Sequence, residues 1–366
     1  MSHTLITPQS DSKSHVRPKG TSFVGLVGVE LRRLWWRRLT KAVLVALVAI
    51  TGLMVYNAYN ASNPETLAQR LDEYQRVVAD MEQQKKEIEA NQPTMIAECR
   101  AAEAAERERT GESSIDFGCD QIGVFQTPTM EEMGITLPVA DAITAELAPY
   151  AAFVYAFLVL LLMGSFVAAE FSTGALGNWL TFKPQRVRVA LSKLAAAGVG
   201  TALLAALGLA LLVLGARMVA TVNRPGADLK LPAPPPLEDS LPELLLRVVA
   251  VAVGAALFGA ALALLVRHTA GLVGMLLGYL VVVEFIAVNA LFGGRLNPWA
   301  ITPNIQAFLN KGYTYMAEAC SGVGGQLSCT YREQAVSYTH GWVYLLVLVL
   351  ATATAAVLVF RRRDVT

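Results

Sequence analysis

Six long apolar stretches dominate this sequence and limit what it can fold into. They occupy residues 41–60, 150–169, 194–216, 244–266, 269–292 and 341–360. Each has about the 20 residues that an α-helix needs to cross about 30 Å of hydrocarbon. Since 54% of the chain is hydrophobic and only 16% is charged, a soluble domain could not cover its surface. The sequence therefore predicts an all-α polytopic membrane protein with six transmembrane helices.

Basic residues gather at alternate ends of these stretches. The clusters fall at residues 32–41, 183–193, 267–268 and 361–363. Because positive charge favours the cytoplasmic side, we expect all four clusters and both termini in the cytoplasm. Residues 1–20 would then form a disordered tail and residues 361–366 a short second tail. The composition, rich in Ala, Val, Leu and Arg, favours a bacterial plasma (inner) membrane.

Residues 21–40 carry apolar side chains at helical spacing beside a basic flank. The flank and its neighbouring indoles comprise Arg32, Arg33, Trp35, Trp36, Arg37 and Arg38. This pattern is typical of an amphipathic helix that lies among the lipid headgroups. The alternative is a basic extension of the first span.

Residues 61–148 form a long polar insertion after the first span. Its apolar residues follow a four-three spacing over about three heptads: Leu67, Leu71, Tyr74, Val78, Met81 and Ile88. After a break at residues 91–93, residues 95–110 favour helix. We expect an extracellular helical hairpin with a coiled-coil-like seam. The alternative is a single solvated helix and a disordered loop.

All four cysteines lie in segments expected outside the membrane. Cys99 and Cys119 belong to the insertion, and Cys320 and Cys329 to the last outer loop, residues 293–340. This distribution favours two disulfides in an oxidising space. Of three connectivities we favour Cys99–Cys119 and Cys320–Cys329, since each closes a local loop. A metal site is the alternative, although no His or CxxC motif accompanies them. The remaining outer loop, residues 217–243, is a Pro-rich spacer.

Known catalytic and nucleotide-binding motifs are missing. The sequence has no GxxxxGK[ST], HExxH or GxSxG motif, so we expect no catalytic residue, metal or cofactor in this chain. A net charge of +1 does not indicate a nucleic-acid partner. Glu284 lies deep in a span, with Asn289 five residues on. An intramembrane carboxylate is a functional candidate by default, and the alternative is a protonated or hydrogen-bonded Glu packed at a helix or subunit interface.

The polar stretch between the second and third spans, residues 170–193, reads EFSTGALGNWLTFKPQRVRVALSK. It offers, in order, Glu170, Gly174, Leu176, Leu180, Pro184, Arg186 and Lys193. Together with six spans and a basic amphipathic helix before the first, this order resembles the membrane (permease) subunit of type-two ATP-binding-cassette (ABC) exporters.

The resemblance implies a transport subunit rather than an enzyme. A separate cytoplasmic ATPase would hold ATP and Mg²⁺ and dock on residues 170–186 as a coupling helix. Its candidate coupling residues are Glu170, Phe171, Gly174, Leu176, Trp179, Leu180, Phe182, Pro184 and Arg186. A second permease copy, as a homodimer or a related chain, would complete the pathway within the membrane lipids. The alternatives are an ABC-linked mechanotransmitter that acts through its outer hairpin, and an ATP-independent transporter centred on Glu284.

Overall fold

The computed structural model describes residues 22–111, 115–122, 127–174, 185–226, 229–237, 239–323 and 326–362. Within them, six helices are long and apolar enough to cross a membrane, so the predicted spans are confirmed at this level. These helices are α2 (Arg38–Ser62), α4 (Ala140–Ser172), α6 (Arg186–Val222), α7 (Leu241–Val266), α8 (Thr269–Gly278) with its wider π-helical continuation η2 (Tyr279–Leu291), and α10 (Tyr338–Arg362).

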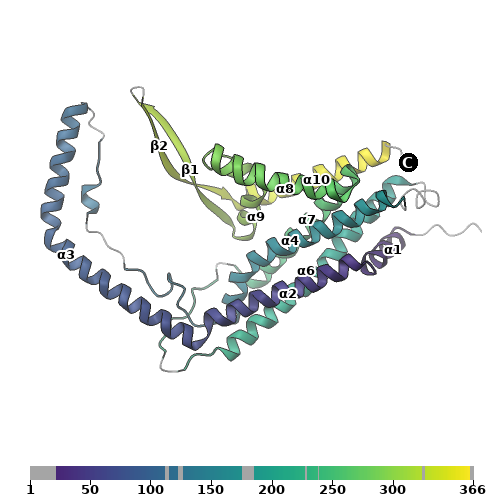
Figure 1. Ribbon diagram of the computed structural model, residues 1–366, viewed down its shortest axis with the longest axis horizontal. Coiled ribbons are helices and arrows are strands. Elements are labelled where there is room, and N and C mark those ends of the chain that lie inside the picture. Colours follow the sequence, from purple (N-terminus) through teal and green to yellow (C-terminus); the bar gives the residue numbers. More distant parts are fainter. Residues whose placement is uncertain are drawn as a thin grey trace, which may run out of the picture.

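The apolar helices form one bundle around α4, α6 and α7. Figure 1 shows α2, α4 and α6 side by side, and α4 packs most extensively against α7. The helix α1 (Phe23–Trp35), the end of α4, the start of α6 and the end of α10 lie at one end of the bundle, called here the junction end. The opposite end carries α3 (Pro64–Thr110) and is called the insertion end.

Small residues let the central helices approach one another closely. A β-carbon at Gly259 would stand 2.7 Å from the backbone oxygen of Leu160, so the backbones of α7 and α4 pack closely at this glycine. The ring of Tyr155 fills the space over Gly208, and its hydroxyl shares a 2.8 Å hydrogen bond with Thr51 Oγ1. Close backbone contact of this kind supplies the packing between helices in lipid, where apolar surface alone gives no driving force.

The turn between α7 and α8 is as tight as the sequence predicts. Arg267 ends α7 in the left-handed region, with φ of 66°, and donates its backbone N–H to Ala263 O at 2.9 Å. His268 Nδ1 then accepts the backbone N–H of Gly271 at 2.9 Å, which caps the start of α8.

The predicted helical hairpin in the insertion is wrong. Helix α3 continues through residues 91–93 without ending, and Pro93 lies inside it. Proline in a helix removes one hydrogen bond and bends the axis, but it does not have to end the helix. Figure 1 shows α3 projecting from the bundle and bending along its length. The expected break is therefore a kink.

A chain that forms no long helix, residues 115–122 and 127–139, returns along α3 and is called here the return segment. It includes the short turn η1 (Cys119–Gln121) and a second turn over residues 129–135. The predicted disulfide Cys99–Cys119 is confirmed and ties it to the helix. Side-chain hydrogen bonds add antiparallel contacts, from Arg107 to Ile115 O, from Gln92 to Ile122 O and from Tyr74 to Pro128 O. The insertion is thus one long helix stiffened by the return segment.

The segment between η2 and α10 contains a sheet that its residue pattern did not predict. After η3 (Asn297–Trp299) and α9 (Ile301–Leu309), β1 (Gly312–Val323) pairs antiparallel with β2 (Gln326–Ser337). Cys320 faces Cys329 in this register and the second predicted disulfide is confirmed. Tyr315, Ala317 and Val336 bury one face of the hairpin against α9.

Candidate functional site

Helix α1 presents an acidic residue in the middle of its buried face. Leu26, Glu30 and Leu34 lie four residues apart, so they share one side of the helix, and all three are buried. A β-carbon at Gly200 of α6 would come within 2.8 Å of the Leu34 side chain, so α1 rests directly on α6. Glu30 is fully buried at 0% exposure and needs a cationic partner.

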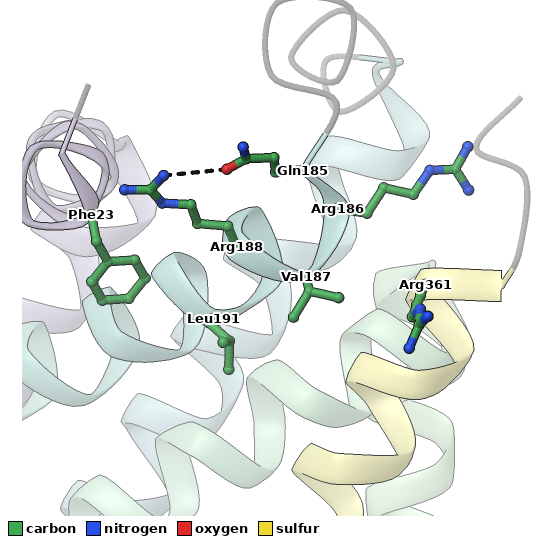
Figure 2. Close-up of a pocket in the computed structure, with 7 residues that line it drawn as sticks. All are labelled: Phe23, Gln185, Arg186, Val187, Arg188, Leu191 and Arg361. Atoms are coloured by element: carbon green, nitrogen blue, oxygen red, sulfur yellow. Dashed lines mark hydrogen bonds between the residues drawn. The ribbon is translucent and has the colours of Figure 1, made fainter. Parts of the chain in front are cut away.

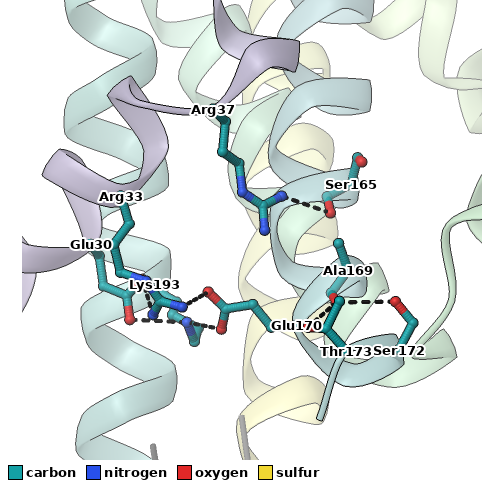
Figure 3. Close-up of polar contacts among 9 residues, drawn as sticks. All are labelled: Glu30, Arg33, Arg37, Ser165, Ala169, Glu170, Ser172, Thr173 and Lys193. Atoms are coloured by element: carbon teal, nitrogen blue, oxygen red, sulfur yellow. Dashed lines mark hydrogen bonds and ion pairs between the residues drawn. The ribbon is translucent and has the colours of Figure 1, made fainter. Parts of the chain in front are cut away.

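That partner is Lys193 on α6, which holds two carboxylates at once. Its Nζ donates to Glu30 Oε1 at 2.9 Å and to Glu170 Oε2, near the end of α4. Arg33 of α1 closes the cluster, with Nη2 3.1 Å from Glu170 Oε1 and Nη1 3.6 Å from Glu30 Oε2. Figure 3 shows these four side chains, called here the charged junction, converging from three helices.

The charged junction is electrically balanced and shielded. Two acids meet two bases, and Glu170 and Lys193 are 2% and 1% exposed. The buried ring of Phe166 lies beside them, with Lys193 Nζ 5.6 Å and Arg37 Cζ 4.7 Å from its centre. Arg37 also donates to Ser165 O at 3.5 Å. Buried charges are tolerated when each is paired in this way, and removing one leaves the others uncompensated.

The charged junction joins the two stems of the predicted coupling loop. Glu170 precedes residues 171–192 and Lys193 follows them, so their contact closes the base of that segment. Glu30 and Arg33 attach α1 to the same point. The charged junction therefore joins α1, α4 and α6 at one point.

Three of the predicted coupling residues besides Glu170 lie in the described chain. Gly174 has φ of 67°, a left-handed conformation that suits glycine just after the end of α4. Phe171 packs edge to face on Phe360 of α10, with ring centres 6.3 Å apart, and lies under the guanidinium of Arg267. Arg186 begins α6. The remaining predicted residues, Leu176, Trp179, Leu180, Phe182 and Pro184, lie outside the described residues.

The six residues predicted for the interfacial helix divide between two helices. Helix α1 ends at Trp35 and α2 begins at Arg38, so α1 is not an extension of the first span. Arg33 and Arg37 turn inward to the charged junction and Phe166. The other four are exposed: Arg32, Trp35, Trp36 and Arg38.

Glu284 lies in η2 and caps the short helix α9. Its Oε1 accepts the backbone N–H groups of Ile301 at 2.8 Å and Thr302 at 3.0 Å, and the hydroxyl of Tyr279 at 2.9 Å. A carboxylate at a helix N-terminus is stabilised by free N–H groups and by the helix dipole. These contacts favour the hydrogen-bonded alternative for Glu284. Asn289 belongs to η2, and its side chain falls outside the described part.

A second ion cluster fastens α7 to the end of α9 at the insertion end. Asp239 contacts both Arg247 and Lys311. Arg247 also donates to Leu309 O at 2.6 Å, and Glu243 lies 3.6 Å from Lys311 Nζ. Burial by itself raises the pKa of Asp239, but the hydrogen bonds and charges of Lys311 and Arg247 together outweigh it, so the pKa lies below its ordinary value. The bond to Asp239 raises the pKa of Lys311 in turn.

Sequence reasoning missed Glu30, although a signal was present. One acidic residue interrupts the apolar positions of residues 23–35, and it stands between Leu26 and Leu34 on their face of the helix. Such a position is costly for a carboxylate unless a cation pairs with it.

Comparison of the sequence with protein-family models and with curated proteins finds no match to either.

Proposed function

We propose that this chain is the permease subunit of an ATP-driven exporter of the type-two ABC kind. The six apolar helices, the separate helix α1 and the loop between α4 and α6 support this proposal. The chain would lie in a bacterial plasma membrane with the junction end in the cytoplasm. There, a separate ATPase subunit would dock on residues 170–186.

The charged junction is the observation that carries the proposal. A motor that pushes on a loop does work on the membrane helices only if the loop is rigidly joined to them. Glu170 and Lys193 are buried, paired and linked to Glu30, so they supply that joint at the base of the loop. A loop that only fixed topology would not require a cluster of four charges with three of them buried, because exposed basic residues suffice.

The first experiment tests the loop as the docking element. The chain is purified from its native host in mild detergent, and co-purifying chains are identified by mass spectrometry. We expect an ATPase with a phosphate-binding GxxxxGK[ST] motif, in a complex of two permease and two ATPase chains by native mass. The double variant W179D/L180D should lower its recovery by about tenfold or more, since two charges would be placed in an apolar contact.

The matched control is F117D/M133D, which places the same two charges on exposed apolar residues of the return segment. It should retain the ATPase. Equal recovery with W179D/L180D and wild type would refute docking through the loop. Loss in both variants would indicate misfolding rather than a lost contact.

A second candidate function is an ABC-linked mechanotransmitter, in which the insertion moves and no solute crosses. The stiffened α3 favours it, because α3 follows α2 with only Asn63 between them. Asn223 of α6 donates to Tyr59 O at 2.7 Å and to Ser62 Oγ at 3.0 Å, which fastens this corner to the bundle. A motion of α2 would thus be carried into the projecting helix.

Replacing residues 64–128 by a short Gly/Ser linker separates the two candidates. The replacement removes both Cys99 and Cys119, so no unpaired thiol remains. A variant that still binds the ATPase but gives no complementation of a gene deletion favours the transmitter. Partial complementation favours the exporter.

A further inference from the structure

A basic pocket opens at the junction end, apart from the charged junction. Its described lining consists of Phe23, Gln185, Arg186, Val187, Arg188, Leu191 and Arg361, around a volume of about 460 Å³. Figure 2 shows Val187 and Leu191 between Phe23 of α1 and Arg361 of α10. Three helices that are distant in sequence therefore build one cavity.

The lining combines cationic and apolar groups. Arg186, Arg188 and Arg361 bring three guanidinium groups, and the described lining contains no acidic residue. Gln185 Oε1 accepts a hydrogen bond from Arg188 Nη1 at 3.2 Å, which orients one guanidinium along the rim. Guanidinium groups bind phosphate in bidentate fashion, so the polar part of the pocket suits a phosphate group.

An exposed apolar stripe on α6 continues from the pocket along the bundle. Its first members, Val187 and Leu191, are one helical turn apart and belong to the pocket wall. The exposed residues that extend it are Val199, Leu203 and Leu207. Val187 and Val199 are about 18 Å apart along the helix, close to the roughly 15 Å thickness of one hydrocarbon leaflet. The stripe is thus long enough for an acyl chain.

We propose that this pocket binds an anionic phospholipid, with its headgroup attracted by the positive charge of the three arginines and an acyl chain along the stripe of α6. Figure 2 shows Arg188 and Arg186 directed to opposite sides of the pocket, so the three surround a headgroup rather than share one phosphate oxygen. An acidic peptide could bind the arginines equally well. It would not, however, account for an exposed apolar stripe that begins in the pocket wall and is as long as one leaflet is thick. The proposal concerns this chain alone and does not depend on the ATPase.

Native mass spectrometry of the full chain tests the proposal. The protein is reconstituted with equal amounts of phosphatidylglycerol and phosphatidylcholine that carry the same acyl chains. Wild type should retain phosphatidylglycerol in preference to phosphatidylcholine. The variant R186Q/R188Q/R361Q should lose this preference by about tenfold or more, because each basic residue contributes to attraction of an anionic lipid.

The matched control is R32Q/R38Q/K41Q, which removes the same three charges from exposed positions of α1 and α2 outside the pocket. It should retain the lipid. Equal loss in both triple variants would overturn the proposal in favour of general basicity at this end. Equal retention of both lipids by wild type would also overturn it, and would leave an acidic protein segment as the occupant.

A second variant distinguishes a phospholipid from free phosphate. L191Q leaves the three arginines intact but interrupts the stripe where it leaves the pocket. It should weaken retention of phosphatidylglycerol, and millimolar inorganic phosphate should not displace the lipid from wild type. Retention unaffected by L191Q together with displacement by phosphate would reduce the site to a phosphate site and refute the lipid assignment.

Discussion

At the scale of single residues, Lys193 has the most demanding position in the chain. It lies between two buried carboxylates, and Arg33 is the other cation of the charged junction. With Lys193 present the four formal charges sum to zero. Without it, two buried acids face one base, Arg33, which is itself partly exposed.

We therefore expect Lys193→Met to destabilise the protein by about 3–5 kcal/mol, as for other broken buried ion pairs. The double variant E170Q/K193M should be more stable than K193M alone, because it leaves the neutral pair of Glu30 and Arg33. Thermal unfolding in detergent measures both. Lys41→Met, at an exposed position, is the control and should unfold near wild type. A double variant less stable than K193M would contradict the charge-balance argument.

Glu284 supports a second residue-level prediction. If its role is to cap α9, Glu284→Gln keeps an acceptor oxygen and should cost about 1 kcal/mol or less. Glu284→Ala removes the acceptor of Thr302 N–H and leaves Ile301 N–H with only the Tyr279 hydroxyl, so it should cost about 1–3 kcal/mol. Unfolding and complementation are measured on both variants. Complete loss of function in E284Q at every pH, with normal stability, would instead support a proton-coupled transporter.

At the scale of elements, the contact of α7 on α4 depends on one missing side chain. Gly259→Ala would force its β-carbon against the backbone of Leu160, which cannot rotate away, so the two helices must separate. We expect a loss of about 1–3 kcal/mol, typical of overpacking. Gly274→Ala on α8 is the control, since no atom lies within 4 Å of its added carbon. A G259A protein that unfolds with wild type would show that the contact can relax.

The ion cluster between α7 and α9 should make stability depend on pH. The lowered pKa of Asp239 stabilises the fold above the unfolded value of about 4, and this contribution is lost as the pH falls through the folded pKa. The raised pKa of Lys311 stabilises the fold below about pH 10, and this contribution is lost as the pH rises through the folded pKa.

The variant D239N should therefore melt below wild type between about pH 5 and 9. The difference should shrink as the pH falls below about 4 towards the lowered folded pKa, because the unfolded wild-type chain then binds a proton at Asp239 that the folded protein does not. Glu243→Gln, at the partly exposed edge of the cluster, serves as the control and should change the melting temperature little at any pH. If the melting temperature of D239N stays below that of wild type by the same amount down to about pH 3, the effect arises from packing and not from the charge of Asp239.

Hydropathy predicts the apolar helices well because each must satisfy its own backbone hydrogen bonds in lipid. It predicts their ends less well. Helix α4 begins at Ala140, about ten residues before the predicted span, since polar residues continue the same helix beyond the apolar stretch. The β1–β2 hairpin was missed because its alternation of small and polar residues gives a weak signal beside such strong apolar runs.

At the scale of the whole molecule, contacts that are local in sequence could be predicted and long-range contacts could not. The disulfides and the hairpin join residues close in sequence, and cysteine spacing partly predicts them. Both ends also depend on contacts between residues far apart in sequence, such as Asp239 with Lys311 at the insertion end and Glu30 with Lys193 at the junction end. The order of residues 170–193 marked Glu170 and Lys193 as candidates, but only the tertiary fold brings Glu30 and Arg33 to them. Residue order alone therefore could not predict that Glu30 and Arg33 belong to the charged junction.

The return segment and α3 set the reach of the insertion jointly. An α-helix advances about 1.5 Å per residue and an extended chain about 3.3 Å, so equal distances consume about twice as many residues in the helix. From Gln92 to Arg107 the helix covers about 22 Å in 15 residue steps. The return segment meets the same two residues with Ile122 and Ile115, which are only seven residues apart although they include the turn η1. Lengthening α3 by two turns would require about three more residues in the return segment. The length of the projection therefore depends on two unequal residue counts. A relative with a longer or shorter projection must change the number of residues in α3 and in the return segment together.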